Sequence, residues 1–227
     1  MMHARRLIAS IALLLAAGPA TGMDTSELRD GEWVSYRDAY RAMVVFEKYG
    51  GPKNFLQSQL QVLPRERGAG TGGLQMTLAG KSTELHLALD PLGRTRLPLQ
   101  KAAYDENAAL VLNRKGVPFT VRPQVSIAPR PDGVYDSADL RAACAQALDF
   151  ARHVDASMRG RRCVGARFVF LNKGEAGVRL RREGGGEQAL PPQDEDAGLQ
   201  AVVYRFGAQQ GQVVTANAPL AILPVFE

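Results

Sequence analysis

Two stretches of the chain space their apolar residues as an α-helix does. In the first, Ser35 can act as an N-cap, and Tyr36, Tyr40 and Met43 follow at i, i+4 and i+7 spacing. A Gly-Gly-Pro run ends this pattern after Tyr49. We therefore predict an amphipathic helix here. Its aromatic side either packs onto a sheet or lines a groove for a sugar or peptide.

The second helical pattern begins at Asp136, which can act as an N-cap, with Asp139 in the first turn. Arg152 and His153 come near its end, where positive charge suits the helix dipole. The apolar stripe of this segment consists of Leu140, Ala143, Cys144, Ala147, Leu148 and Ala151. We expect a second amphipathic helix that points Cys144 into the fold.

Elsewhere apolar residues alternate with polar ones, and turn residues separate the segments, as expected for short β-strands. The predicted strands are residues 55–62, 74–78, 83–89, 94–99, 109–113, 117–127, 163–171, 176–182, 199–206, 212–215 and 220–226. Pro118 and Pro123 favour an edge position for the strand that contains them. These strands and the two amphipathic helices predict an α+β fold that is mainly β, with antiparallel β-sandwich or barrel-like strands.

The beginning of the chain has the pattern of a secretory signal peptide, residues 1–22. Arg5 and Arg6 precede the apolar run Leu7–Ala17, which is too short to span a bilayer. Small residues follow, and we expect cleavage after Gly22, with Ala20 as the alternative site. An uncleaved anchor is the alternative. No later stretch is long and apolar enough for a transmembrane helix. We expect a soluble protein that is exported to a bacterial periplasm or secreted.

A Pro-Asp-Gly turn at residues 131–133 divides the mature chain. We expect residues 23–133 to hold the first helix and an antiparallel β region, and residues 134–227 to hold the second helix and a further β-sheet region. With 227 residues in all, the chain can form one large domain or two small ones, and either can bury a core.

The sequence contains only two cysteines, Cys144 and Cys163, and we predict that they form a structural disulfide. Two thiols in an oxidising compartment usually pair. The helix carries the chain roughly 15 Å beyond Cys144, and the eight or so residues that return to Cys163 can span up to ~28 Å, so the loop can close. A redox-active pair is the alternative, but the Cys-x-x-Cys spacing typical of such pairs is missing.

Basic residues concentrate late in the chain. Of 28 Lys and Arg, 26 remain once the signal peptide is removed, against 23 Asp and Glu; the resulting net charge of +3 is too small to indicate nucleic-acid binding. Residues 151–182 alone hold nine basic and two acidic residues, a charge of +7. The candidate residues for binding an anion or a partner are Arg159, Arg161, Arg162, Arg167, Arg179 and Arg181. Such a face can bind an anionic cell-envelope component or an acidic protein, or it can be a solvated surface balanced by the acidic loop at residues 193–196.

The sequence carries no recognisable catalytic motif: a Gly-x-Ser-x-Gly elbow, a His-Glu-x-x-His pair and a Ser-x-x-Lys nucleophile are all missing. His86 and His153 lie far apart and outside any Asp/Glu/His cluster, so we expect no metal site and no cofactor. We therefore expect a non-catalytic binding or accessory module with a basic face. A periplasmic hydrolase with a dispersed active site is the alternative. A pocket that brings either histidine beside carboxylates would favour the hydrolase.

Overall fold

The computed structural model describes residues 33–65, 73–114, 118–171, 176–195, 198–207 and 210–227, so the predicted signal peptide lies outside the described residues. The first half of the described chain contains β1 (Trp33–Ser35), α1 (Tyr36–Lys48), β2 (Leu56–Pro64), β3 (Gln75–Ala79), β4 (Glu84–Ala88), β5 (Arg94–Thr95), α2 (Lys101–Asp105), β6 (Ala109–Leu112) and β7 (Phe119–Ile127). The second half contains β8 (Val134–Asp136), α3 (Ser137–Val154), the 3₁₀-helix η2 (Ala156–Gly160), β9 (Cys163–Phe170), β10 (Val178–Arg182), β11 (Glu187–Ala189), β12 (Pro192–Asp194), β13 (Gln200–Arg205), β14 (Gly211–Thr215) and β15 (Ala221–Phe226).

Strands dominate these elements, and they form three antiparallel sheets. Two sheets have four strands, in the orders β1-β6-β3-β4 and β11-β10-β14-β8, and the third has seven, in the order β12-β13-β9-β15-β7-β2-β5. None of the sheets in the described part of the chain closes into a barrel. The predicted α+β, mainly-β class is confirmed.

The two predicted amphipathic helices are confirmed as α1 and α3, while the short helix α2 was not predicted. The hydroxyl of Ser35 accepts a hydrogen bond from the backbone N–H of Asp38 at 3.4 Å, which makes Ser35 the N-cap of α1. At the other end, Lys53 Nζ donates to the carbonyls of Phe46 and Glu47 at 2.8 and 2.6 Å. Because α2 has only five residues, it is too short to produce a helical period in the sequence.

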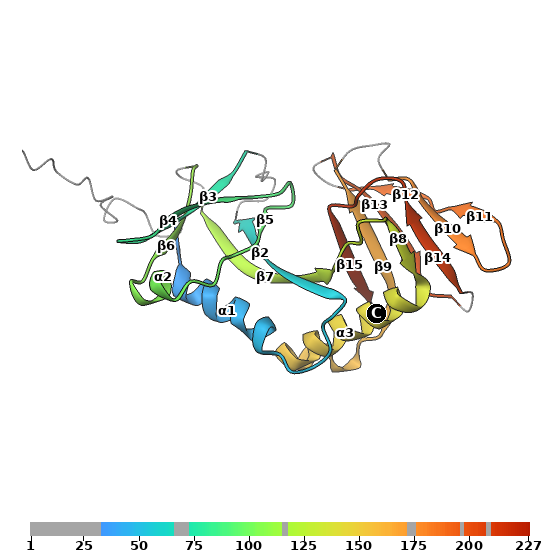
Figure 1. Ribbon diagram of the computed structural model, residues 1–227, viewed down its shortest axis with the longest axis horizontal. Helices are drawn as coiled ribbons and strands as arrows, with labels where there is room; N and C mark the ends of the chain where they lie inside the picture. The colour runs from blue at the N-terminus through green and yellow to red at the C-terminus, as the bar shows by residue number, and fades with distance from the viewer. Residues whose placement is uncertain (1–32, 66–72, 115–117, 172–175, 196–197, 208–209) are drawn as a thin grey trace, which may run out of the picture.

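The two halves of the chain repeat one topology. The strands β1, β6, β3 and β4 of the first half are arranged like β8, β14, β10 and β11 of the second. In the seven-stranded sheet, the strands from one edge to the centre are β5, β2 and β7. At the other edge β12 comes first, and the strands that follow toward the centre are β13, β9 and β15. Its central strands β7 and β15 are antiparallel, so the halves are related by a pseudo-two-fold axis near that junction. Figure 1 shows the two lobes, with α1 and α3 along the same side of the shared sheet.

The helices α1 and α3 correspond residue by residue at a spacing of 101. Each follows a three-residue strand directly, β1 or β8, and each carries an aspartate in its first turn. Every position that α1 buries is also buried 101 residues later in α3. These pairs are Tyr36 and Ser137, Ala39 and Leu140, Met43 and Cys144, and Phe46 and Ala147. Both helices therefore turn the same face toward the sheets.

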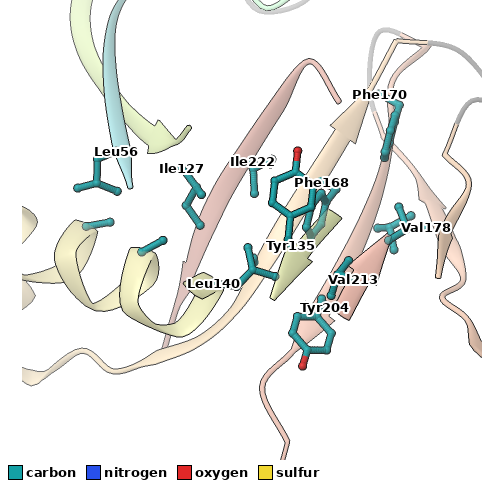
Figure 2. Close-up of a cluster of buried hydrophobic side chains, with 14 of the residues drawn as sticks. Leu56, Ile127, Tyr135, Leu140, Phe168, Phe170, Val178, Tyr204, Val213 and Ile222 are labelled. Atoms are coloured by element: carbon teal, nitrogen blue, oxygen red, sulfur yellow. The ribbon is translucent and has the colours of Figure 1, made fainter. Parts of the chain in front are cut away.

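The fold has two large hydrophobic cores; the first consists of first-half residues, and the second also takes in Phe46, Leu56 and Ile127 of the first half. In the first, Tyr36 is fully buried; its hydroxyl donates to Pro98 O at 2.7 Å and accepts from Gln100 N at 2.8 Å. In the second, Figure 2 shows Leu140 of α3 near Tyr135 and Phe168 from the strands. The buried positions of Tyr36 and of Phe46 in these cores favour sheet packing over an aromatic-lined groove for the aromatic side of α1.

A buried arginine links the halves. Arg94 is 3% exposed, and its Nε and Nη2 donate to Asp90 Oδ2 at 2.9 and 2.7 Å. Its Nη2 also donates to the backbone carbonyl of Leu220, which precedes β15 in the second half. The division at residue 133 into two regions, which form one domain or two, stays a prediction, and both regions contribute strands to the seven-stranded sheet.

The prediction that the strand with Pro123 lies at a sheet edge is wrong, because β7 lies between β2 and β15. The pairing of β7 with β2 runs along all nine residues of both strands. Its pairing with β15 consists of one pair among the described residues, Ile127 with Ile222. Most of the β15-facing side of β7 is therefore free of ladder hydrogen bonds, a setting that tolerates proline.

Candidate functional site

The disulfide between Cys144 and Cys163 is confirmed. The Sγ atoms lie 2.05 Å apart and the Cα atoms 5.9 Å apart. Helix α3 positions Cys144 on its buried stripe, and Cys163 is the first residue of β9. The bond therefore fixes the return of the chain from α3 into the seven-stranded sheet, and the intervening segment carries three of the six candidate arginines.

These three, Arg159, Arg161 and Arg162, are exposed, and within the described residues none of their side chains forms an ion pair or a hydrogen bond. The backbone beneath them pairs with Glu227. Arg162 N donates to Glu227 O at 2.7 Å, and Glu227 N donates back to Arg162 O at 2.9 Å. The unpaired guanidinium groups thus project from a segment fixed both by the disulfide and by the last residue of the chain.

The start of this segment is ordered by an acidic cap. The Asp155 carboxylate accepts from the backbone N–H of Ser157 at 2.9 Å. Hydrogen bonds from the side chain and backbone of Ser157 lower the pKa of Asp155. The carboxylate therefore stays charged in mild acid and caps η2.

Arg167 lies elsewhere and has a partner. It sits on β9 between β13 and β15, and its Nη2 forms an ion pair with the carboxylate of Glu195. The sequence left open whether this arginine pairs with a carboxylate of the protein or binds an outside anion. The ion pair with Glu195 favours the structural role.

Arg179 and Arg181 also have a partner, and they share it. Both lie on β10 and reach Glu187 of the neighbouring strand β11, at 3.4 and 3.0 Å. An outside anion would have to compete with Glu187 for them. The six candidate arginines therefore fall into two groups, and only Arg159, Arg161 and Arg162 offer charge that no described carboxylate already neutralises.

The helix end beside these three arginines carries Arg152 and His153. Arg152 Nη2 donates to the backbone carbonyl of Arg161 at 2.8 Å, and its Nη1 lies 3.3 Å from Asp149 Oδ1. The ring of His153 lies 5.2 Å from that of Tyr49, centroid to centroid. His153 therefore packs beside an aromatic ring near the carboxyl end of α3, where positive charge is favourable.

The structure also contains an apolar groove that the sequence did not predict. It encloses about 410 Å³ between α1 and α3, above β7 and β15, and every residue that lines it is apolar. Val45 of α1 and Val154 of α3 stand at its sides and are 41% and 53% exposed. The periodicity of each helix marked the buried face correctly. On α1 the groove uses Ala42 and Val45, which lie beside the buried face, whereas on α3 it includes Ala147 and Ala151 of the predicted stripe. These positions become apolar neighbours only when the two helices meet.

His86 lines a hollow on the first half, and His153 packs against Tyr49. His86 Nδ1 lies 3.0 Å from Thr77 Oγ1 on the paired strand, and the hollow that His86 lines contains no carboxylate. Among the described residues, no three His, Cys, Asp or Glu side chains come together in a way that could hold a metal ion. The described residues thus do not form the histidine–carboxylate pocket that would favour a hydrolase.

Comparison of the sequence with protein-family models and with curated proteins, and of the fold with solved structures, gives no match. The described helices include none with the length and apolar character needed to cross a bilayer.

Proposed function

We propose that this protein is an exported, non-catalytic binding module whose basic segment at Arg159, Arg161 and Arg162 meets an anionic component of the cell envelope or an acidic partner protein. The observation that carries the proposal is the contrast between these three unpaired arginines and the other three candidates, which already face Glu187 or Glu195. Export follows from the predicted signal peptide, and the disulfide is typical of an oxidising compartment.

The geometry of the segment supports recognition by charge. The disulfide at Cys163 and the backbone pair of Arg162 with Glu227 hold the carboxyl end of the arginine cluster, and α3 and η2 hold its other end, so less conformational entropy is lost when a ligand binds. Exposed guanidinium groups bind carboxylates and phosphates in bidentate fashion. At physiological ionic strength their attraction extends about 8 Å, so binding must weaken as salt is added.

The test is retention of envelope fractions by the immobilised protein at low and then at high salt. We expect retention at low salt and release at high salt. Changing Arg159, Arg161 and Arg162 together to Gln should abolish retention. The matched control changes the same net charge on β10 by replacing Arg179, Arg181 and Arg182 with Gln, and it should keep retention.

Two outcomes would contradict the proposal. If the wild-type protein retains nothing at low salt, or if its retention ignores salt, recognition does not depend on exposed charge. If the two triple variants lose retention equally, net charge matters and the arginine cluster has no special role.

A further inference from the structure

The apolar groove lies where the two halves of the chain meet. Its floor consists of Pro123 and Val125 from β7 and of Pro224 and Phe226 from β15. At the spacing of 101 residues that relates the helices, Pro123 corresponds to Pro224 and Val125 to Phe226. The pseudo-two-fold axis therefore passes through the floor of the groove.

The groove stays open for two reasons. β7 and β15 pair only at Ile127 and Ile222 within the described chain, and proline has no N–H to extend the ladder where Pro123 and Pro224 lie. The walls carry small side chains, such as Ala42 of α1, which leave the space between the helices unfilled.

The chemistry of the lining restricts what can bind. Pockets of roughly 300–1,000 Å³ hold small ligands, and the groove, at about 410 Å³, falls in this range. Its apolar side chains can stabilise hydrocarbon but cannot pair with a polar group placed among them. Along α3 the lining runs from Ala147 to Val154, a length of roughly 10 Å at 1.5 Å per residue. The part of the ligand that the groove holds is therefore a short apolar chain.

Positive charge lies at one end of the groove. Val154 is the last residue of α3, immediately before the segment with the unpaired arginines, and Phe226 adjoins Glu227, whose backbone pairs with Arg162. The carboxylates nearby are already engaged. Asp155 is bonded to Ser157, and Glu227 Oε1 lies 2.6 Å from Arg205 Nη1. An anionic head group at this end would therefore meet Arg159, Arg161 and Arg162 without displacing a carboxylate of the protein.

We propose that the groove binds the acyl chain of a single-chain anionic amphiphile, whose head group contacts the arginines after α3. The part of this proposal that concerns the head group rests on the proposed function, because it assigns the anion-binding arginines a specific ligand. The part that concerns the acyl chain rests on the groove alone. The combination explains why the unpaired arginines and the exposed Val154 lie next to one another.

Isothermal titration of the full mature chain with dodecanoate, below the concentration at which micelles form, tests the proposal. We expect saturable binding, with Kd falling about fourfold for each added methylene until the chain fills the groove of roughly 10 Å, and little further gain beyond that length. Dodecyltrimethylammonium, which has the same chain with a cationic head, should bind at least fivefold more weakly. Equal binding of the two amphiphiles, or no heat with dodecanoate at either of two well-separated temperatures, would overturn the proposal.

Three variants localise the site. Changing Val45 and Val154 together to Asp should weaken dodecanoate binding by more than about tenfold, since it brings carboxylates to the groove. Leu99→Asp, at another exposed apolar position outside the groove, should bind as the wild-type protein does. Ala151→Phe fills the groove without adding charge and should also weaken binding. If both groove variants bind normally, the ligand sits elsewhere and the proposal fails.

The arginine variant separates this proposal from the proposed function. With Arg159, Arg161 and Arg162 changed to Gln, we expect about fivefold weaker binding of dodecanoate. If this variant binds dodecanoate normally but loses envelope retention, the amphiphile proposal fails and the proposed function stands. If dodecanoate binding follows the expected pattern but the wild-type protein retains no envelope component, the proposed function fails by itself. The groove could instead serve self-association. In that case the wild-type protein is dimeric, the variant with Val45 and Val154 changed to Asp is monomeric, and dodecanoate does not bind. This outcome also overturns the proposal.

Discussion

Replacing Cys144 and Cys163 together with Ala should destabilise the protein and release the basic segment. The two cysteines are 19 residues apart in sequence, and closing a loop of about 20 residues stabilises a fold by roughly 3 kcal/mol on the chain-entropy account. Cys144 is completely buried, so removal of its sulfur adds a small cavity cost of about 1 kcal/mol. We therefore expect the free energy of unfolding to fall by about 4 kcal/mol.

Urea unfolding followed by far-UV circular dichroism measures this effect. With a slope of about 2 kcal/mol per molar urea, the midpoint should fall by about 2 M in the double variant. Reduced wild-type protein is the matched control, because it keeps both sulfurs and loses only the cross-link; its midpoint should fall by about 1.5 M. If oxidised and reduced wild-type proteins unfold at the same urea concentration, the disulfide does not constrain the unfolded chain. Reduced protein that still retained envelope fractions as strongly would show that the disulfide does not fix the arginines for binding.

Three further predictions concern buried polar groups. Arg94→Met leaves the carboxylate of Asp90 unpaired and should lower the free energy of unfolding by about 2–4 kcal/mol in urea titrations. The control Arg96→Met, at an exposed position, should change the free energy of unfolding by less than about 0.5 kcal/mol. Tyr36→Phe leaves the Gln100 N–H without its acceptor and should cost about 1–3 kcal/mol by the same measurement; an unchanged midpoint would contradict this. Burial raises the pKa of Tyr135, so its ionisation is harder in the folded chain than in the unfolded one. Stability should therefore fall as pH rises above about 10, and Tyr135→Phe should flatten that fall in thermal unfolding scans.

The helices and the disulfide were predictable because their signals are local. The pattern beginning at Ser35 gave α1 to within a residue at each end, since a capping hydroxyl and a Gly-Gly-Pro stop mark both limits. Cys144 was placed correctly because its position on the apolar stripe fixes which way it points. The strand predicted at residues 94–99 shrank to Arg94–Thr95, because the residues that follow join no ladder. Leu97 still packs into the core, whereas Arg96 and Leu99 are exposed.

The state of the arginines could be predicted only in part. Arg181 and Glu187 face one another across the β10–β11 hairpin, so their pairing follows from a short turn that the sequence shows. The pairing of Arg167 with Glu195 depends on β9 and β13 lying side by side, which no local pattern encodes. Charge counting therefore placed all six candidate arginines in one patch, while the fold leaves only the three after α3 unpaired.

The repeated topology explains why the sequence did not predict the groove and why the two ends of the groove differ. The helices of the two halves bury corresponding positions, and a few residues 101 positions apart are identical, such as Asp38 and Asp139. These identities are too few for a repeat to be recognised in the sequence. Symmetry alone would make the two ends of a groove on the axis alike. However, α3 has 18 residues against 13 in α1, and only α3 is followed by a 3₁₀-helix and a disulfide-bound return that carries arginines. The corresponding turn after α1 is shorter, and its Lys53 is bonded to the helix end. The end of the groove beside α3 therefore adjoins unpaired positive charge, and the proposed amphiphile should bind with its head group at this end.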